Sequence, residues 1–194
     1  MPPKKKFSKE QIVDKAFEIA KTEGIDSITA RRIAEELKCS VAPIYFNFKD
    51  IDDLKQAVVR KIFELTRKLA QKTYTGDQFL DIGIASLKFA KDYSVLFREL
   101  VLTKNKYMDD YDQELGNDII GEIIKEKELS QFSEEEVGII FLKMRIFQLG
   151  LSVMVANELL PEVFDEEKQI ELLKSAGEDV IQSTGLKKLK NKRS

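Results

Sequence analysis

Two short helical segments joined by a turn of three residues constrain the fold of this 194-residue chain more than any other feature. Thr29 is a favourable N-cap for a helix over residues 30–37, and Ser40 is a favourable N-cap for a helix that ends near Asn47. Residues 38–40 remain for a tight turn. Two helices of about eight residues in this arrangement predict a helix-turn-helix, whose second helix enters the major groove of DNA.

The second helix has a proline near its start, in the stretch SVAPIYFNFKD. With Ser40 as the N-cap, Pro43 is the third helical residue, where the backbone nitrogen has no intrahelical acceptor and a missing N–H costs no bond. Ala42 precedes the proline and is a mild choice for that crowded position. Ala42 and Pro43 therefore form a compact apolar tip, which fits against thymine methyl groups in the groove.

The other residues of this helix divide by their angular position. Val41, Ile44 and Phe48 share one helical face and are predicted to pack into the core of the domain. A second group is predicted to face DNA: Tyr45, Phe46 and Asn47. A phenol and an amide both bond phosphate oxygens. Taken alone, the pentapeptide IYFNF also fits a packed corner of a helical bundle, but the preceding capped helix and turn favour the helix-turn-helix.

Helical periodicity extends over the rest of the chain, which we expect to be all-α with about nine helices. Ser8 and Gln11 predict a capping box ahead of the first helix, which Gly24 ends in the αL conformation. Asp50 caps a fourth helix. Five further helices are expected over residues of about 77–92, 94–102, 109–127, 134–158 and 166–183. We expect a DNA-binding domain over residues 5–65 and a helical ligand-binding and dimerisation domain over residues 66–194.

Composition limits the chemistry that this chain can perform. The chain has no histidine, which excludes His-based metal sites and Ser-His-Asp triads. Its single cysteine, Cys39, forms no intrachain disulfide and fits a reducing, cytoplasmic compartment. The start MPPKKKF lacks the apolar stretch of a secretory signal. We expect no cofactor, no metal and no enzymatic activity, although chemistry based on Lys, Glu or Tyr is left open.

Charge is distributed unevenly along the chain. Residues 1–61 carry 13 Lys or Arg against 10 Asp or Glu, whereas residues 62–186 carry 14 against 24. A basic N-terminal region on an acidic body indicates that only the N-terminal region binds a polyanion. Chance asymmetry of solvated faces is the alternative explanation.

The segment IDSITARRIAEELKCSVAPIYFNFKDIDDLKQAV resembles the DNA-binding domain of TetR-family transcriptional repressors. It shares their Thr-capped helix, the Ile-Ala pair, the turn and the aromatic ending of the next helix. The resemblance covers residues 8–60. It implies DNA contacts by these residues: Thr29, Arg31, Ala42, Pro43, Tyr45, Phe46, Asn47 and Lys49.

The resemblance also implies a role for each residue of this set. Thr29, Tyr45 and Asn47 match positions that contact phosphates in the family, and Phe46 lies where another aromatic residue follows the DNA backbone. Arg31 falls where some members place an arginine on a guanine edge, a contact that bidentate geometry favours. The Ala-Pro tip occupies the base-reading position.

Two positions depart from the family pattern. Lys38 stands where the family usually has the glycine of the turn, and a left-handed backbone costs a lysine more than a glycine. Many members have a lysine at the position of Ile51, which is followed here by Asp52 and Asp53. This acidic pair suits a helix N-terminus but repels phosphates. Candidates to replace the missing positive charge are Lys49, Lys55 and the Lys4–Lys6 arm.

The acidic pair slightly favours an alternative function. In that reading the chain is a small-molecule sensor or carrier that retains the helix-turn-helix as a scaffold.

The most apolar run of the chain is VGIIFLKMRIFQLGLSVMVA, residues 137–156. Its length would span a bilayer, but Lys143, Arg145 and Gln148 lie near its centre, and each central cation costs about 2.5–3.5 kcal/mol on insertion. We therefore expect a buried helix that is apolar on nearly all sides. Such a helix favours a homodimer interface through residues 134–158 and 166–183. The alternative is a helix wholly central within a monomer.

The body is also expected to bind a small apolar or amphipathic effector, as the resemblance implies. The candidate ligand-binding residues are aromatic and methionine side chains: Phe89, Tyr93, Phe97, Met108, Phe141, Met144 and Phe147. Side chains of these types at helical spacing are equally typical of a core. Lys143 and Arg145 are expected to form ion pairs within the protein, with an anionic effector as the alternative. One acidic cluster lacks metal-ligand spacing and is expected to be a solvated helix start: Asp109, Asp110, Asp112 and Glu114.

These features together predict a homodimeric DNA-binding repressor. Its operator is expected to be nearly palindromic, and an effector bound to the body is expected to release it.

Overall fold

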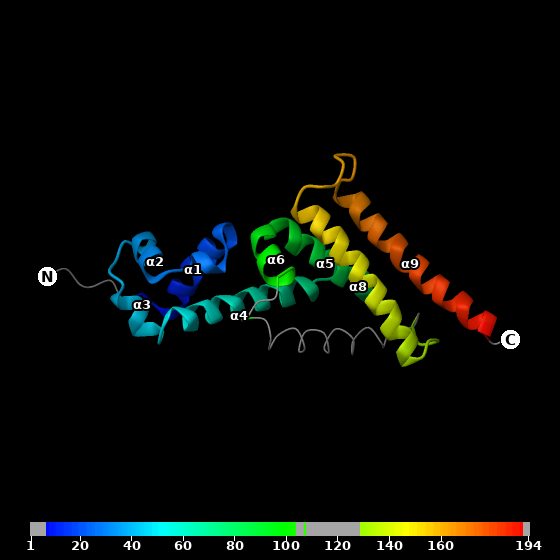
Figure 1. The fold of residues 1–194 in the computed structure, drawn as a ribbon, viewed down its shortest axis with the longest axis horizontal. Coiled ribbons are helices and arrows are strands. Elements are labelled where there is room, and N and C mark those ends of the chain that lie inside the picture. The colour runs from blue at the N-terminus through cyan, green and yellow to red at the C-terminus, as the bar shows by residue number, and fades with distance from the viewer. Residues whose placement is uncertain (1–6, 104–106, 108–128, 192–194) are drawn as a thin grey trace. The chain divides into compact units, whose positions relative to one another are not determined.

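The computed structural model of the chain describes residues 7–103, 107 and 129–191, with side chains described as far as residue 186. Every regular element in these residues is helical, as predicted (Figure 1). The predicted helix over residues 109–127 lies outside the described residues. The elements are α1 Lys9–Glu23, the 3-10 turn η1 Ile25–Ser27, α2 Ala30–Leu37, α3 Ala42–Asn47, α4 Ile51–Ala70, α5 Gln78–Asp92, α6 Ser94–Val101, α8 Glu134–Ala156 and α9 Glu166–Asn191.

The chain forms two compact units. The first comprises Met1–Lys68 and Tyr93–Met108, and the second comprises Leu69–Asp92 and Asp109–Ser194. The division of function between residues 5–65 and 66–194 stays a prediction.

In the first unit, α1 packs against η1, α2 and α6. Ser8 and Gln11 make the predicted capping box at its start. Gly24 ends it with φ 89° and ψ 164°, a conformation open to glycine but different from the αL cap that we predicted. The α6 segment belongs to the same unit. The Glu99 carboxylate accepts a hydrogen bond of 2.7 Å from the backbone N–H of Ile25, and this bond ties α6 to the end of α1.

The turn after α2 has a left-handed residue. Lys38 has φ 52° and ψ 49°, and its N–H donates to the Glu35 carbonyl at 3.1 Å. The next N–H, of Cys39, donates to the Ala34 carbonyl at 2.9 Å. This pair of bonds is a Schellman motif, which satisfies the last carbonyls of the helix. Lys38 therefore adopts the left-handed conformation that we predicted to be unfavourable for a lysine at the position where the family has a glycine.

Replacing this lysine with glycine should stabilise the protein. A left-handed conformation costs a non-glycine residue about 1–2 kcal/mol, part of which glycine loses again through its greater freedom in the unfolded chain. We expect Lys38→Gly to raise the free energy of unfolding by about 0.5–1 kcal/mol, measured by chemical denaturation. Lys38→Ala is the matched control and should change it little, because alanine meets the same backbone strain. Equal values for the two variants would contradict this account of the turn.

In the second unit, α5, α8 and α9 pack against one another, and α8 and α9 run side by side in opposite directions (Figure 1). The main core cluster comprises Leu80, Ile84, Leu87, Met144, Leu151 and Leu173. Gly83 of α5 lies so close to α9 that an added Cβ would stand 2.5 Å from a methyl group of Leu173. A capping box of Ser133 and Glu136 starts α8, as predicted, and the helix ends at Ala156, two residues earlier than predicted.

The outer side of α8 is apolar and exposed. Its exposed side chains include Ile139, Leu142 and Ile146, which are 45%, 57% and 64% accessible. Within the described residues α8 is also the one helix long and apolar enough to cross a membrane, with 28% of that apolar window buried. Lys143 and Arg145 lie within this helix. When a helix packs one apolar side into a core and leaves another apolar side exposed, the exposed side is typically covered by another protein chain.

A buried carboxylate holds the loop that precedes α5. The side chain of Asp81 accepts hydrogen bonds from the backbone N–H groups of Tyr74, Thr75 and Gly76, at 3.1, 2.7 and 3.3 Å. It also accepts one of 2.7 Å from the Thr75 hydroxyl. Burial alone would raise the pKa of Asp81, but these hydrogen bonds favour the ionised form and leave its pKa below the ordinary value.

The ionised Asp81 should therefore make stability depend on pH. Because its folded pKa is lowered, the stabilisation is present above the ordinary pKa of 3.8 and is lost as pH falls through the folded value. We expect Asp81→Asn to lower the free energy of unfolding at pH 7 by about 1.5–3 kcal/mol, the range for hydrogen bonds to a charged group. Urea denaturation from pH 7 to pH 3 should show the two proteins converging in acid. A constant difference over that range would contradict the role of the charge.

Candidate nucleic-acid interface

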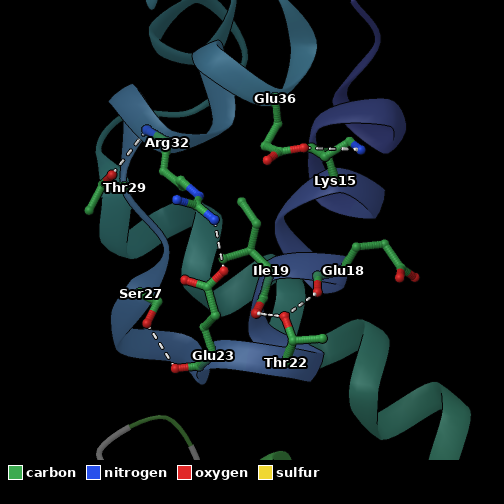
Figure 2. Close-up of polar contacts among 9 residues, drawn as sticks. All are labelled: Lys15, Glu18, Ile19, Thr22, Glu23, Ser27, Thr29, Arg32 and Glu36. Carbon is green, nitrogen blue, oxygen red and sulfur yellow. Dashed lines mark hydrogen bonds and ion pairs between the residues drawn. The ribbon is translucent and has the colours of Figure 1, made fainter.

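The start of α2 has the geometry that the sequence predicts. Thr29 is extended, with φ −132° and ψ 151°, and its exposed hydroxyl accepts a hydrogen bond of 3.1 Å from the N–H of Arg32. Figure 2 shows that Arg32 also reaches Glu23 of α1, at 2.8 Å. Lys15 and Glu36 form a second, longer link between α1 and α2, at 3.8 Å (Figure 2). These ion pairs link α1 to α2 while Thr29 stays on the surface.

The core anchors α3 through two side chains. Ile44 is 1% exposed and Phe48, which directly follows the helix, is 2% exposed. Both were predicted to pack inward. Lys9 of α1 places its ammonium 4.9 Å from the centre of the Phe48 ring. These contacts hold α3 with one side in the core and the other side in solvent.

The predicted start of α3 was wrong. The helix begins at Ala42 with Val41 as its N-cap, so Ser40 is not the cap and Pro43 is the second helical residue. The reason lies in the proline itself. A serine N-cap at position 40 would accept from the N–H of residue 42 or 43, and Pro43 has no N–H to donate. With this shift Val41 stands outside the core, 41% exposed, contrary to the prediction.

The outer side of α3 is bare and almost entirely apolar. Ala42 is exposed, Tyr45 is 56% exposed and Phe46 is 90% exposed. Pro43 is half-buried. Within the described residues of its own unit, no other side chain covers this surface. It is therefore accessible to a groove of DNA.

Asn47 has a structural bond that the sequence did not indicate. Its half-buried side-chain amide donates to the backbone carbonyl of Pro43 at 2.8 Å and to that of Phe7 at 3.4 Å. It therefore connects the end of α3 to the segment that precedes α1. Hydrophobic periodicity holds no signal for such a bond. The predicted phosphate contact of Asn47 stays a prediction.

Two cations of the predicted set lie on α2 and just after α3. The Arg31 side chain is 89% exposed, and its Nε donates to the Glu35 carboxylate at 3.0 Å. Four N–H groups of the guanidinium remain for a ligand. Lys49 is exposed and follows Phe48 directly. Both are on the surface of the first unit, as a contact with DNA requires.

The acidic residues at the start of α4 have partners inside the first unit. Asp50 caps the helix, as predicted, by accepting from the N–H of Asp53 at 2.9 Å, and Asp53 accepts from the N–H of Lys49 at 3.2 Å. Asp52 accepts a hydrogen bond of 2.9 Å from the hydroxyl of the buried Tyr107. These bonds give the acidic pair a role in the fold, so the pair does not require a function other than DNA binding.

One of the cations that could replace the family's lysine at the position of Ile51 already forms an ion pair within the protein. Lys55 bonds Asp26 at 3.0 Å, and its side chain is 12% exposed. Lys49 is exposed, and the Lys4–Lys6 arm lies outside the described residues.

The predicted ligand-binding residues are divided between the two units. Tyr93 and Phe97 belong to the first, where Phe97 is 1% exposed. In the second unit Phe89 and Met144 are buried, while Phe141 and Phe147 are half-buried beside the core clusters. Met108 and the acidic cluster at 109–114 lie outside the described residues. An open hollow of about 330 Å³ on the first unit is lined by Phe7, Gln11, Asp14, Lys15, Glu18 and Leu37, and by none of the seven candidates.

Comparisons with known proteins agree with this geometry. Residues 12–58 match the family model described as bacterial regulatory proteins, tetR family. The matched region contains α1, the helix-turn-helix and the first part of α4. No curated protein sequence matches the chain.

Solved structures resemble the chain over most of its length. The fatty acid degradation regulator FadR from Bacillus halodurans superposes with a TM-score of 0.59 at 14% identity, covering 92% of this chain and 97% of FadR. The Streptomyces coelicolor TetR family protein ActR, solved in complex with (S)-DNPA, gives a TM-score of 0.55 at 16% identity, covering 92% of this chain and 99% of ActR. At these identities the similarity shows the fold.

Proposed function

We propose that this chain, a TetR-family DNA-binding regulator, represses transcription as a homodimer bound to a nearly palindromic operator. The observation that carries the proposal is the exposed side of α3. Ile44 and Phe48 fix the helix in the core, and Ala42, Tyr45 and Phe46 are turned to solvent. Two such helices in a dimer would enter successive major grooves about 34–36 Å apart.

The residues around α3 supply the contacts that the proposal needs. Thr29 and Tyr45 each present a hydroxyl at the surface, Lys49 presents a cation, and all three groups suit phosphate oxygens. Arg31 is assigned to a base edge, and Ala42 with Pro43 to the tip that enters the groove. In this proposal Phe46 also contacts DNA, and Asn47 contributes mainly by holding α3 in place.

The exposed side of α8 supports the homodimer. Leu142 and Ile146 would be buried against a second copy of the chain, together with the neighbouring part of α9. A small apolar or amphipathic effector in the body would release the operator by favouring a dimer whose two α3 helices are wrongly spaced. The aromatic and methionine candidates named above are its proposed contacts, and the protein is proposed to act in the cytoplasm.

A carboxylate placed at the front of α3 should abolish DNA binding without unfolding the protein. Ala42 is exposed and is the first residue of the helix, where an acidic side chain is compatible with the helix dipole. Against DNA, the same charge faces phosphates at a cost of several kcal/mol. We expect Ala42→Glu to lower the affinity for a fragment of the protein's own promoter region by at least about 100-fold, measured by fluorescence anisotropy.

The matched control for this variant is Gln71→Glu. It adds the same charge at an exposed position directly after the end of α4, in the second unit. It should bind like the wild type. If Ala42→Glu also bound like the wild type, with its circular dichroism unchanged, α3 would not be the DNA-binding helix.

A cation on the outer side of α8 should separate the dimer. Ile146 is 64% exposed in the single chain, so Ile146→Lys leaves its fold intact but places a charge in the proposed interface. We expect a shift from dimer to monomer at micromolar concentration in analytical ultracentrifugation. Gln71→Lys is the charge-matched control and should remain a dimer. A wild type that sediments as a monomer, or an Ile146→Lys variant that remains dimeric, would contradict the proposed interface.

A further inference from the structure

The outer side of α3 offers almost no groups that form hydrogen bonds. Among the exposed side chains from Val41 to Phe46, the phenol of Tyr45 is the one polar group. Asn47 directs its amide nitrogen to two backbone carbonyls of its own unit. Phe46 is the most exposed of the large hydrophobic side chains in the described part of the chain, at 90%. A side chain of this size gains nothing for the fold by standing in water.

Ala42 and Phe46 form a ridge on this outer side. They are four residues apart, so their side chains lie one above the other on the same face of the helix. Ile44 lies between them in sequence and points the opposite way, into the core, at 1% exposure. Ala42 and Phe46 therefore lie on the side of α3 that faces away from Ile44 and the core.

An apolar ridge can distinguish bases in the major groove in one way. Guanine, cytosine and adenine present hydrogen-bond donors and acceptors there, whereas thymine also presents the C5 methyl group. Alanine and phenylalanine are side chains that contact this methyl group. A ridge without donors or acceptors leaves the polar edges of every base pair unpaired, including O4 of thymine, so the methyl group is the one feature that favours thymine.

We propose that α3 recognises its half-site through thymine methyl groups, with Phe46 and Ala42 as the residues that determine specificity. This inference rests on the proposed DNA binding and names the class of sequence that is bound: a half-site with consecutive thymines opposite α3. Phe46 thus reads bases, in contrast to the backbone position that the family resemblance implies for it. Arg31, from α2, reads a neighbouring base edge by hydrogen bonds and does not depend on methyl groups.

DNA is favoured over a protein partner for this ridge. The ridge lies on the second helix of a helix-turn-helix within residues 12–58, which match the tetR family model. The exposed Thr29, Arg31 and Lys49 belong to the same unit, and their groups suit phosphates and base edges. A second copy of the chain bound at Phe46 is an outcome that the experiment below detects.

The test compares operator DNA containing thymine with the same DNA containing deoxyuridine at the thymines of each half-site. The exchange removes the methyl groups and keeps every hydrogen-bonding atom of the base. We expect the wild-type affinity to fall about fourfold for each contacted methyl group, the effect of exposing one buried methyl group. 5-Bromodeoxyuridine, whose bromine has the size of a methyl group, should restore binding.

Phe46→Ala assigns the effect to the ridge. The side chain is exposed, so the variant should keep the circular dichroism of the wild type. It should bind thymine DNA more weakly than the wild type does. Its affinity should also fall much less, or not at all, when deoxyuridine replaces thymine. Arg31→Ala is the control, and its loss on exchange should equal that of the wild type.

The outcomes separate this inference from the proposed function. Tight wild-type binding that ignores the exchange, or a Phe46→Ala variant that keeps the full loss, overturns methyl recognition and leaves DNA binding intact. Absence of binding to every promoter fragment overturns both. If the protein dimerises without DNA and Phe46→Ala abolishes this dimer, the ridge binds a second copy of the chain. That result would also overturn the inference.

Discussion

The burial of Ile44 and Phe48 is the interaction on which the proposed DNA-binding face depends. A helix as short as Ala42–Asn47 is not stable in water by itself, because so few backbone bonds cannot offset the cost of starting a helix. Burying these two side chains fixes α3 in the core of the first unit without using its outer side. The Schellman turn at Lys38 sets the direction in which the chain leaves α2, and the amide of Asn47 fastens the far end.

The sequence predicted the helices and most of their caps because these depend on local chemistry. The capping boxes at Ser8 and Ser133, and the caps at Thr29 and Asp50, were all found where the residue types indicated them. The start of α3 was not predicted correctly, since two local rules competed there. A serine favours capping, but the proline three residues later removes a donor that the cap needs. The bond from Asn47 to Phe7 spans 40 residues and has no local signal.

The body could be predicted as a set of helices but not as a binding site. Aromatic and methionine residues at helical spacing fit a core and a ligand pocket equally well, and Phe97 and Met144 are packed at 1% and 6% exposure. The exposed apolar side of α8 was easier to anticipate, because a helix that is apolar all round has more apolar surface than its own fold can cover. The proposed dimerisation and DNA binding thus rest on exposed surfaces, whereas the proposed effector site rests on side chains that the fold already uses.

The salt dependence of DNA binding tests the central claim most directly, because a protein that binds the groove must displace counterions from phosphates. On duplex DNA the logarithm of the association constant falls against the logarithm of salt concentration by about 0.9 for each neutralised phosphate. In a dimer, each of the two chains contributes Lys49 and the Lys4–Lys6 arm. The slope on the protein's own promoter DNA should therefore be steeper than about −2. A slope near zero, or no binding at low salt, would mean that the helix-turn-helix of this chain is a scaffold.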